Sequence, residues 1–157
     1  MSPRHAAPGA TAGAVPLPTV PRRGLARWSD GWLLVFLGLC AGLAYANILF
    51  NAFVYDDNTQ ILNNPYLQSF RHLREIFTTT VWSYVGAQGV TNYYRPMMTF
   101  GYLLCYQFFG PLAYGFHLAS IVLHVGVVWV LFLVTQRMFQ DRRVALVAAS
   151  LFALHPV

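Results

Sequence analysis

The sequence predicts an all-α integral membrane protein, and its composition supports that fold class in three ways. Of the 157 residues, 57% are hydrophobic, and the mean hydropathy is +0.48. Only 10% are charged, compared with roughly a quarter in soluble globular domains. The apolar residues are concentrated in long runs without charge, which is typical of membrane-spanning helices. These observations exclude a soluble globular domain.

The chain is expected to begin with a disordered basic cytoplasmic tail that leads into a first membrane span. Residues 1–29 are rich in Pro, Ala and Gly and contain four Arg, without apolar periodicity. Residues 32–50 then form an uncharged run, which as a helix just crosses a hydrocarbon core of roughly 30 Å. The same pattern resembles a cleavable secretory signal with an A-x-A motif at residues 44–46. We favour an uncleaved span, because the run is long for a signal and further apolar segments follow.

A polar segment follows the first span and contains the start of an amphipathic helix. Asn64 and Pro65 are typical of a helix start, with Asn as the N-cap and Pro at the first helical position. Apolar residues then recur at helical spacing, and polar residues occupy the other side. The pattern predicts one short amphipathic helix in the membrane interface. Its apolar face comprises Leu67, Phe70, Leu73, Ile76 and Phe77.

The next uncharged stretch, residues 96–136, is interrupted by Gly110 and Pro111. It could contain two spans, at about 97–109 and 112–136. Alternatively, only the second part crosses, and the first part is a buried or interfacial helix. Residues 97–109 would give about 20 Å of helix, which is too short to cross comfortably.

The distribution of Arg residues decides between these topologies. The connection 137–143 contains three Arg and one Asp, so the positive-inside rule places it in the cytoplasm with the basic tail. An even number of crossings must therefore separate the two segments. Spans at about 32–50 and 114–136 meet that condition and make residues 51–113 an extracytoplasmic loop. For the same reason the net charge of +5 indicates membrane topology and contact with membrane lipid, and no nucleic-acid partner is expected.

A third apolar segment, residues 144–157, is predicted to begin another crossing, in the outward direction. It holds only 14 residues before the sequence stops, so we expect a truncated span and a continuation in the gene. His155 and Pro156 mark a point where a helix commonly breaks, which would place His155 near the outer end of this span.

Two adjacent carboxylates, Asp56 and Asp57, are the leading candidates for chemistry. They follow the first span by a few residues, on the predicted outer side. One could accept the proton of an attacking hydroxyl as a general base, or the pair could hold a divalent cation through oxygen ligands. The alternative is a solvated turn with an N-cap aspartate. No Cys/His pattern in the sequence has the spacing of a metal site.

Arg95 is a second candidate, because it is a charge beside a long apolar surface, with Tyr93 and Tyr94 before it. A guanidinium fork there could bind a lipid phosphate through two hydrogen bonds. The alternative is ordinary snorkelling, with the tyrosines in the aromatic belt.

His117 and His124 are seven residues apart in the second predicted span and therefore share one helix face. Intramembrane histidines are functional candidates by default. We favour the other interpretation, in which they form hydrogen bonds between helices.

Four short segments occur in one order along the chain: residues 53–57, residues 92–96, residues 115–118 with His124, and residues 153–157. Together they resemble the N-terminal part of the polytopic glycosyltransferases of the GT-C superfamily. The most similar members are the transmembrane-plus-TPR O-mannosyltransferase-like proteins and their bacterial relatives. The resemblance covers about residues 30–157.

The resemblance implies a GT-C-type polytopic helical bundle with juxtamembrane helices in the first extracytoplasmic loop. It also implies transfer of a sugar from a polyprenyl-phosphate-linked donor to a protein or glycan acceptor outside the membrane. Asp56 or Asp57 would then be the catalytic carboxylate, and Arg95 would bind the donor phosphate. The residues that could support them are Tyr94, His117, His124 and His155.

The sequence stops before the second His and the acidic residue that usually follow the family's His-Pro-Val motif. We therefore expect this fragment to be inactive alone, and expect the remainder to include most of the spans and any TPR region. The bacterial relatives suggest an inner-membrane location with a cytoplasmic N-terminus. The alternative function is a non-catalytic anchor, assembly or transport subunit, in which Asp56, Asp57 and Arg95 would not converge.

Overall fold

The structure is a computed structural model that describes residues 29–86 and 93–155, and no strand occurs in these ranges. The predicted all-α fold is therefore confirmed. Most of the predicted tail, Asn92 and the last two residues of the chain lie outside the described residues. The elements are α1 (Asp30–Tyr45), η1 (Ala46–Phe50), η2 (Asn58–Leu62), η3 (Pro65–Gln68), η4 (Phe70–His72), α2 (Leu73–Thr78), η5 (Ser83–Val85), α3 (Pro96–Phe109), α4 (Ala113–Phe139) and α5 (Arg142–Leu154).

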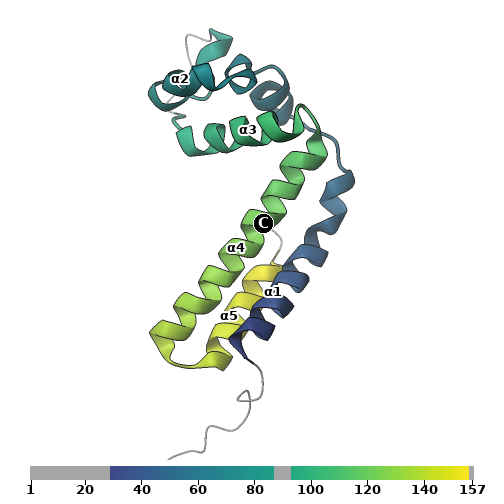
Figure 1. The fold of residues 1–157 in the computed structure, drawn as a ribbon, viewed down its shortest axis with the longest axis vertical. Coiled ribbons are helices and arrows are strands. Elements are labelled where there is room, and N and C mark those ends of the chain that lie inside the picture. The colour runs from purple at the N-terminus through teal and green to yellow at the C-terminus, as the bar shows by residue number, and fades with distance from the viewer. Residues whose placement is uncertain (1–28, 87–92, 156–157) are drawn as a thin grey trace, which may run out of the picture.

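Helices α1, α4 and α5 pack side by side and form the bundle (Figure 1). Within the described ranges, two helical segments are long and apolar enough to cross a membrane: Asp30–Phe50, which joins α1 and η1, and Ala113–Phe139. α4 extends about 40 Å, whereas the 13 residues of α5 extend about 20 Å. Consequently α5 covers only part of the length of α4.

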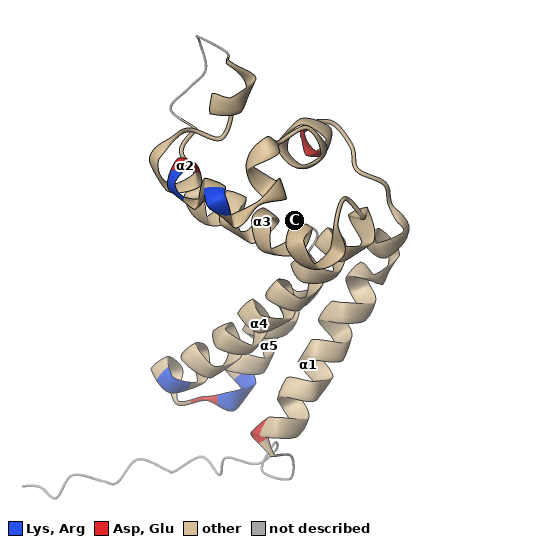
Figure 2. Ribbon diagram, turned by 45° about the horizontal axis from the view of Figure 1, so that its top comes forward, with Lys and Arg blue, Asp and Glu red and all other residues tan. Residues whose placement is uncertain are grey.

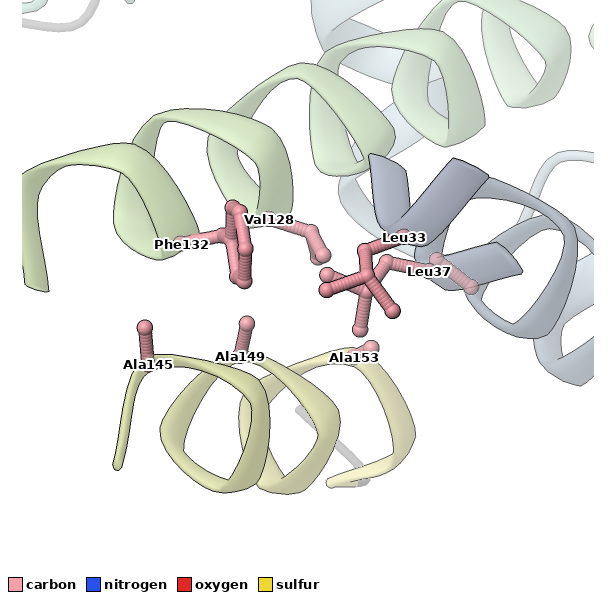
Figure 3. Packing of buried hydrophobic residues seen from close by; sticks show 8 residues of the cluster. Leu33, Leu37, Val128, Phe132, Ala145, Ala149 and Ala153 are labelled. Carbon is pink, nitrogen blue, oxygen red and sulfur yellow. The ribbon is translucent and has the colours of Figure 1, made fainter. Parts of the chain in front are cut away.

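The core of the bundle consists of large side chains from α1 and α4 that meet small side chains from α5 (Figure 3). Alanines at every fourth position of α5 let its backbone approach the other two helices closely. The outer surface is apolar, with Leu43, Leu123 and Leu151 about 70% exposed, which suits contact with lipid rather than water. The core residues are Leu33, Leu37, Ala41, Val128, Phe132, Ala145, Ala149 and Ala153.

Charged residues lie at the two ends of the molecule, with an uncharged middle (Figure 2). At one end, Nη2 of Arg142 lies 2.7 Å from Oδ1 of Asp30. This ion pair joins the start of α5 to the start of α1. The beginning of α1 and the α4–α5 connection therefore lie at the same end of the bundle.

The cap, which comprises residues 51–86 and 93–109, covers the opposite end. α3 lies across the end of the bundle rather than alongside α4 (Figure 1), which favours the interpretation of residues 97–109 as a buried or interfacial helix. Short elements pack onto α3 and enclose a second apolar core. Its buried members are Ile61, Leu67, Ile76, Leu103 and Phe116.

The single amphipathic helix predicted after Asn64 is wrong, although its start is correct. Oδ1 of Asn64 accepts a hydrogen bond from Tyr66 N at 3.0 Å, and Pro65 follows as the first helical residue. Ser69 is extended (φ −154°, ψ 141°), and its Oγ caps a new turn at Arg71 N. Serine competes with the helix for backbone hydrogen bonds, so the predicted helix is broken into η3, η4 and α2. Leu67 on the predicted apolar face is buried against α3.

Candidate functional site

Asp56 and Asp57 lie in a tight turn that follows η1. Val54 N donates a hydrogen bond to Oδ2 of Asp57 at 3.2 Å, and Asp57 N donates to Val54 O at 3.0 Å. Between them, Tyr55 has a φ of 45°, an uncommon backbone conformation for a bulky residue, and such conformations often occur at functional sites. Asp57 is half-buried, and Asp56 is exposed. The turn therefore holds Asp57 in place and leaves Asp56 in solvent.

Arg95 is the N-cap of α3, and two tyrosines fix its position. Nη2 of Arg95 donates to the Tyr93 hydroxyl at 3.0 Å, and its guanidinium carbon lies 4.3 Å from the centre of the Tyr93 ring, which is a cation–π arrangement. The Tyr94 hydroxyl donates to Phe77 O at 2.6 Å and fastens the start of α3 to α2. Within the described ranges, no carboxylate pairs with Arg95, so its remaining N–H groups are available to a ligand.

A hollow lies beside Arg95, between α2 and the first turns of α3. Hydroxyl-bearing and apolar side chains share its lining. Thr99, one turn along α3, donates through its backbone N to Arg95 O at 3.2 Å. The lining includes Tyr66, Ile76, Thr79, Val81, Arg95 and Thr99.

Phe116 connects the Asp57 turn to α3. Its ring meets the Phe53 ring edge-on, with centroids 5.4 Å apart, and it meets the Tyr102 ring in the same manner at 5.9 Å. Phe116 belongs to α4 and is buried. It therefore fixes the position of the turn that carries Asp57 relative to the helix that begins at Arg95.

Tyr102 lies on α3 and packs against Phe116, and both Asp57 and Arg95 influence its pKa. Burial is the main cause that raises the pKa of Tyr102; the Asp57 carboxylate raises this pKa further, and the Arg95 guanidinium lowers it. Both charges are therefore within electrostatic range of one phenol. Sequence reasoning missed Tyr102, although its position seven residues after Arg95 places the two on one face of α3.

His124 contacts α1 and α5 within the bundle. Its Nε2 lies 3.4 Å from Ala153 O, and its ring stacks on Phe152 at 5.4 Å and meets Tyr45 at 4.9 Å. These contacts agree with the favoured role of hydrogen bonding between helices. His124 lies about 10 Å further along α4 from the cap than His117 does.

His155 follows the last residue of α5, and its backbone carbonyl accepts a hydrogen bond from the Tyr45 hydroxyl. Tyr45 also contacts His124, so His155 lies partway along the bundle. His155 lies directly after the end of α5, as the sequence predicted, and the described part of α5 is about half as long as α4. The structure therefore does not bring His155 to the turn that carries Asp57.

His117 lies closer to that turn, with its ring centroid 6.4 Å from that of Phe53. Its Nε2 is buried and has no hydrogen-bond partner among the residues that the structure describes. Of the three predicted supporting histidines, His117 alone is placed beneath the cap.

The divalent cation considered for Asp56 and Asp57 would find few protein ligands. Among the described residues, no group of three or more His, Cys, Asp or Glu side chains could hold a metal ion. A cation at the pair would depend on backbone carbonyls, water or the substrate for its remaining ligands.

Comparison with known proteins relates the chain to one family. The chain is 33% identical over 127 residues to the protein O-mannosyl-transferase Tmtc1 of Drosophila melanogaster, over 78% of this chain and 15% of that protein. It is 35% identical over 114 residues to TMTC3 of Mus musculus, over 72% of the chain and 12% of the relative. It is also 35% identical over 118 residues to TMTC1 of Homo sapiens, over 73% and 13%.

The chain therefore spans 12 to 15% of the length of these curated relatives. No family model matches it. No solved structure matches it either.

Proposed function

Because this chain is a relative of the TMTC-family protein O-mannosyl-transferases, as its motifs predicted, we propose that it is the N-terminal module of a membrane glycosyltransferase. The enzyme moves a sugar from a polyprenyl-phosphate-linked donor to a protein or glycan acceptor. The names of the relatives favour mannose and a protein. The observation that carries the proposal is the contact of the Phe116 ring with Phe53 and with Tyr102, which brings the turn of Asp57 to the helix that begins at Arg95.

In the proposed reaction the oxygen of an acceptor hydroxyl bonds to C1 of the sugar as the bond between C1 and the phosphate oxygen breaks. The electron pair of that bond leaves with the polyprenyl phosphate. The proton of the acceptor hydroxyl passes to a carboxylate of the cap as general base. The guanidinium of Arg95 stabilises the negative charge that grows on the leaving phosphate.

The contacts favour Asp57 over Asp56 as the base. Asp57 is half-buried, its carboxylate is held by Val54 N, and its turn is anchored by the contact of Phe53 with Phe116. A carboxylate that is already oriented needs no reorganisation when the substrate binds. The exposed Asp56 is available to contact the acceptor or a cation.

In the proposed topology the bundle crosses the bacterial inner membrane and the cap lies on its outer surface, with the N-terminus in the cytoplasm. This orientation is supported by Arg142 and Arg143 at one end of the bundle, because short basic connections remain in the cytoplasm. In the cap, Met97 and Phe108 on α3 are 69% and 81% exposed, as expected of a helix that rests on lipid. The phosphate of a lipid-linked donor would then lie at the level of Arg95.

The catalytic part of the proposal is tested by Asp56→Asn and Asp57→Asn in the full-length gene product, with mannose transfer from mannosyl polyprenyl phosphate measured in membrane vesicles. We expect Asp57→Asn to lower the transfer rate by at least about 100-fold, and Asp56→Asn to lower it less. Asp141→Asn is the matched control, since Asn caps a helix as well as Asp does. Full activity in both cap variants would remove the catalytic role and favour a non-catalytic anchor or assembly subunit.

The topology is tested separately, by single cysteines at Gln60 and Gln140 in a chain whose Cys40 and Cys105 are replaced by Ala. A membrane-impermeant maleimide added outside should label position 60 and should reach position 140 only after the membrane is permeabilised. Labelling of both positions from one side would contradict the proposed topology without affecting the catalytic assignment.

A further inference from the structure

The Tyr102 side chain is held by packing at a defined place in the cap. It lies seven residues after Arg95 on α3, which is about 10 Å along the same helix face. Its ring packs edge-on against the buried Phe116 at 5.9 Å, and it belongs to the residues that cover the cap core. The position of the phenol is therefore set before any substrate binds.

The hydroxyl of Tyr102, in contrast, makes no hydrogen bond to a described residue. Two other tyrosines of the cap use their hydroxyls to tie segments together, since Tyr84 donates to Thr59 O at 2.6 Å and Tyr94 donates to Phe77 O at 2.6 Å. Tyr102 makes no such bond to any residue that the structure describes. A fixed ring with an available hydroxyl is an arrangement that fits a hydrogen bond to a ligand.

The charges around Tyr102 indicate what that ligand would be. The guanidinium of Arg95 attracts anions, and the Asp57 carboxylate is suited to a hydroxyl that gives up a proton; both groups lie within electrostatic range of the phenol. Burial keeps the pKa of Tyr102 above its usual value. The phenol is therefore protonated at neutral pH and can donate a hydrogen bond to an oxygen anion.

We propose that Tyr102 belongs to the site as a hydrogen-bond donor to the phosphate of the lipid-linked sugar, on the same face of α3 as Arg95. This inference rests on the proposed glycosyltransferase function. Tyr102 retains its proton throughout, because the acceptor proton passes to Asp57 and the electron pair leaves with the phosphate. The hydrogen bond strengthens as negative charge grows on that phosphate, so Tyr102 contributes to the rate as well as to binding.

Tyr102→Phe tests the role, because it removes the hydroxyl and retains the ring that packs on Phe116. We expect the transfer rate of the full-length gene product to fall by about 10- to 100-fold, the loss typical of a hydrogen bond to a charged group, with kcat reduced more than KM is raised. Tyr106→Phe, one turn further along α3, is the matched control and should transfer at the unmodified rate. A Tyr102→Phe variant as active as Tyr106→Phe would overturn the inference.

The same series distinguishes this inference from the proposed function. If the unmodified protein is active, Asp57→Asn is inactive and Tyr102→Phe is fully active, then the role of Tyr102 alone is wrong. If the unmodified protein transfers no sugar, or Asp57→Asn retains full activity, then the proposed function itself fails.

A binding measurement does not depend on turnover. Nanodiscs containing the protein would be titrated with a C55 polyprenyl phosphate and, separately, with the neutral C55 polyprenol. Tyr102→Phe should weaken binding of the phosphate about tenfold and leave binding of the polyprenol unchanged, whereas equal weakening of both would assign Tyr102 to packing. If Tyr102→Phe does not fold, 3-fluorotyrosine at position 102 replaces it. Its more acidic phenol should bind the phosphate more tightly, and unchanged binding would overturn the role.

Discussion

The bundle and the cap are stabilised in different ways. In the bundle, large side chains such as Leu37 and Phe132 meet Ala149 on α5, and all three are fully buried. Lipid on the outside is as apolar as this core, so close packing of small against large residues holds the helices together. In the cap, short elements are tied by hydrogen bonds such as those of Tyr84 and Tyr94 to backbone carbonyls, and by edge-on aromatic contacts.

Because of this difference, the residues that stabilise the bundle are distinct from the candidate functional groups of the cap. The candidate groups Asp57, Arg95 and Tyr102 lie in the cap, on a turn and on a helix that crosses the end of the bundle. The bundle contributes Phe116, whose ring extends into the cap core. Substitutions in the two regions should therefore have distinguishable effects, which can be followed by hydrogen exchange of each region and by sugar transfer.

The largest effect is expected from Ala149→Phe, which overfills the bundle core. Ala149 is fully buried between α1 and α4, so a phenyl ring there must push α5 away. We expect a loss of about 3 kcal/mol in the free energy of unfolding, the upper end of what overpacking costs. Unfolding in an SDS titration measures this loss, with Leu151→Phe on the exposed face of α5 as the control. Equal stability of the two variants would show that α5 does not pack as described.

The second-largest effect is expected from Gly115→Ala, at the place where α3 of the cap meets α4 of the bundle. A Cβ on Gly115 would overlap the Cβ and Cγ of Phe109 at the end of α3, so Gly115→Ala must move α3 relative to α4. We expect a modest destabilisation of about 1–2 kcal/mol but a loss of sugar transfer of at least about tenfold, since small displacements of catalytic groups are costly. Gly126→Ala is the control, because a Cβ there meets open space. Unchanged transfer would mean that the orientation of α3 does not set the site.

The smallest effect is expected within the cap, from Tyr84→Phe, which removes the hydrogen bond to Thr59 O. The loss is about 1 kcal/mol and should appear as faster hydrogen exchange in η2, with α4 and α5 unchanged. Burial raises the pKa of Tyr84 above 10.0, so the unfolded chain loses this proton first as pH rises. The Tyr84 contribution to cap stability is therefore retained below pH 10 and declines as pH rises through the raised pKa. Tyr114→Phe, at an exposed tyrosine, is the control; if it loosens η2 to the same extent, the tie to Thr59 has no special role.

The long helices could be predicted from the sequence, and the candidate residues proposed from it, because both depend on local patterns. An uncharged run such as residues 113–136 carries its own hydropathy signal, and the length of residues 97–109 already argues against a crossing. Asn64 and Pro65 marked a helix start through their own chemistry. The grouping of Asp57 with Arg95 followed only from resemblance, since no local pattern relates the two.

What could not be predicted depends on competition or on distant contacts. Ser69 is compatible with a continuous helix by spacing, and its side chain ends the first turn by capping the next one. In the sequence, Tyr102 is one of many aromatic residues in apolar segments. Only the contacts of Phe116 with Phe53 and Tyr102 show that α3 lies beside the Asp57 turn.

Phe116 also connects the candidate site to a helix long and apolar enough to cross a membrane. Its ring is part of α4, and the orientation of a spanning helix changes with the thickness of the bilayer that surrounds it. A change in tilt would carry the ring away from Phe53 or Tyr102 and alter the separation of the groups attached to them. Sugar transfer should therefore vary with the acyl-chain length of the host membrane, so that membrane composition becomes a determinant of catalytic geometry.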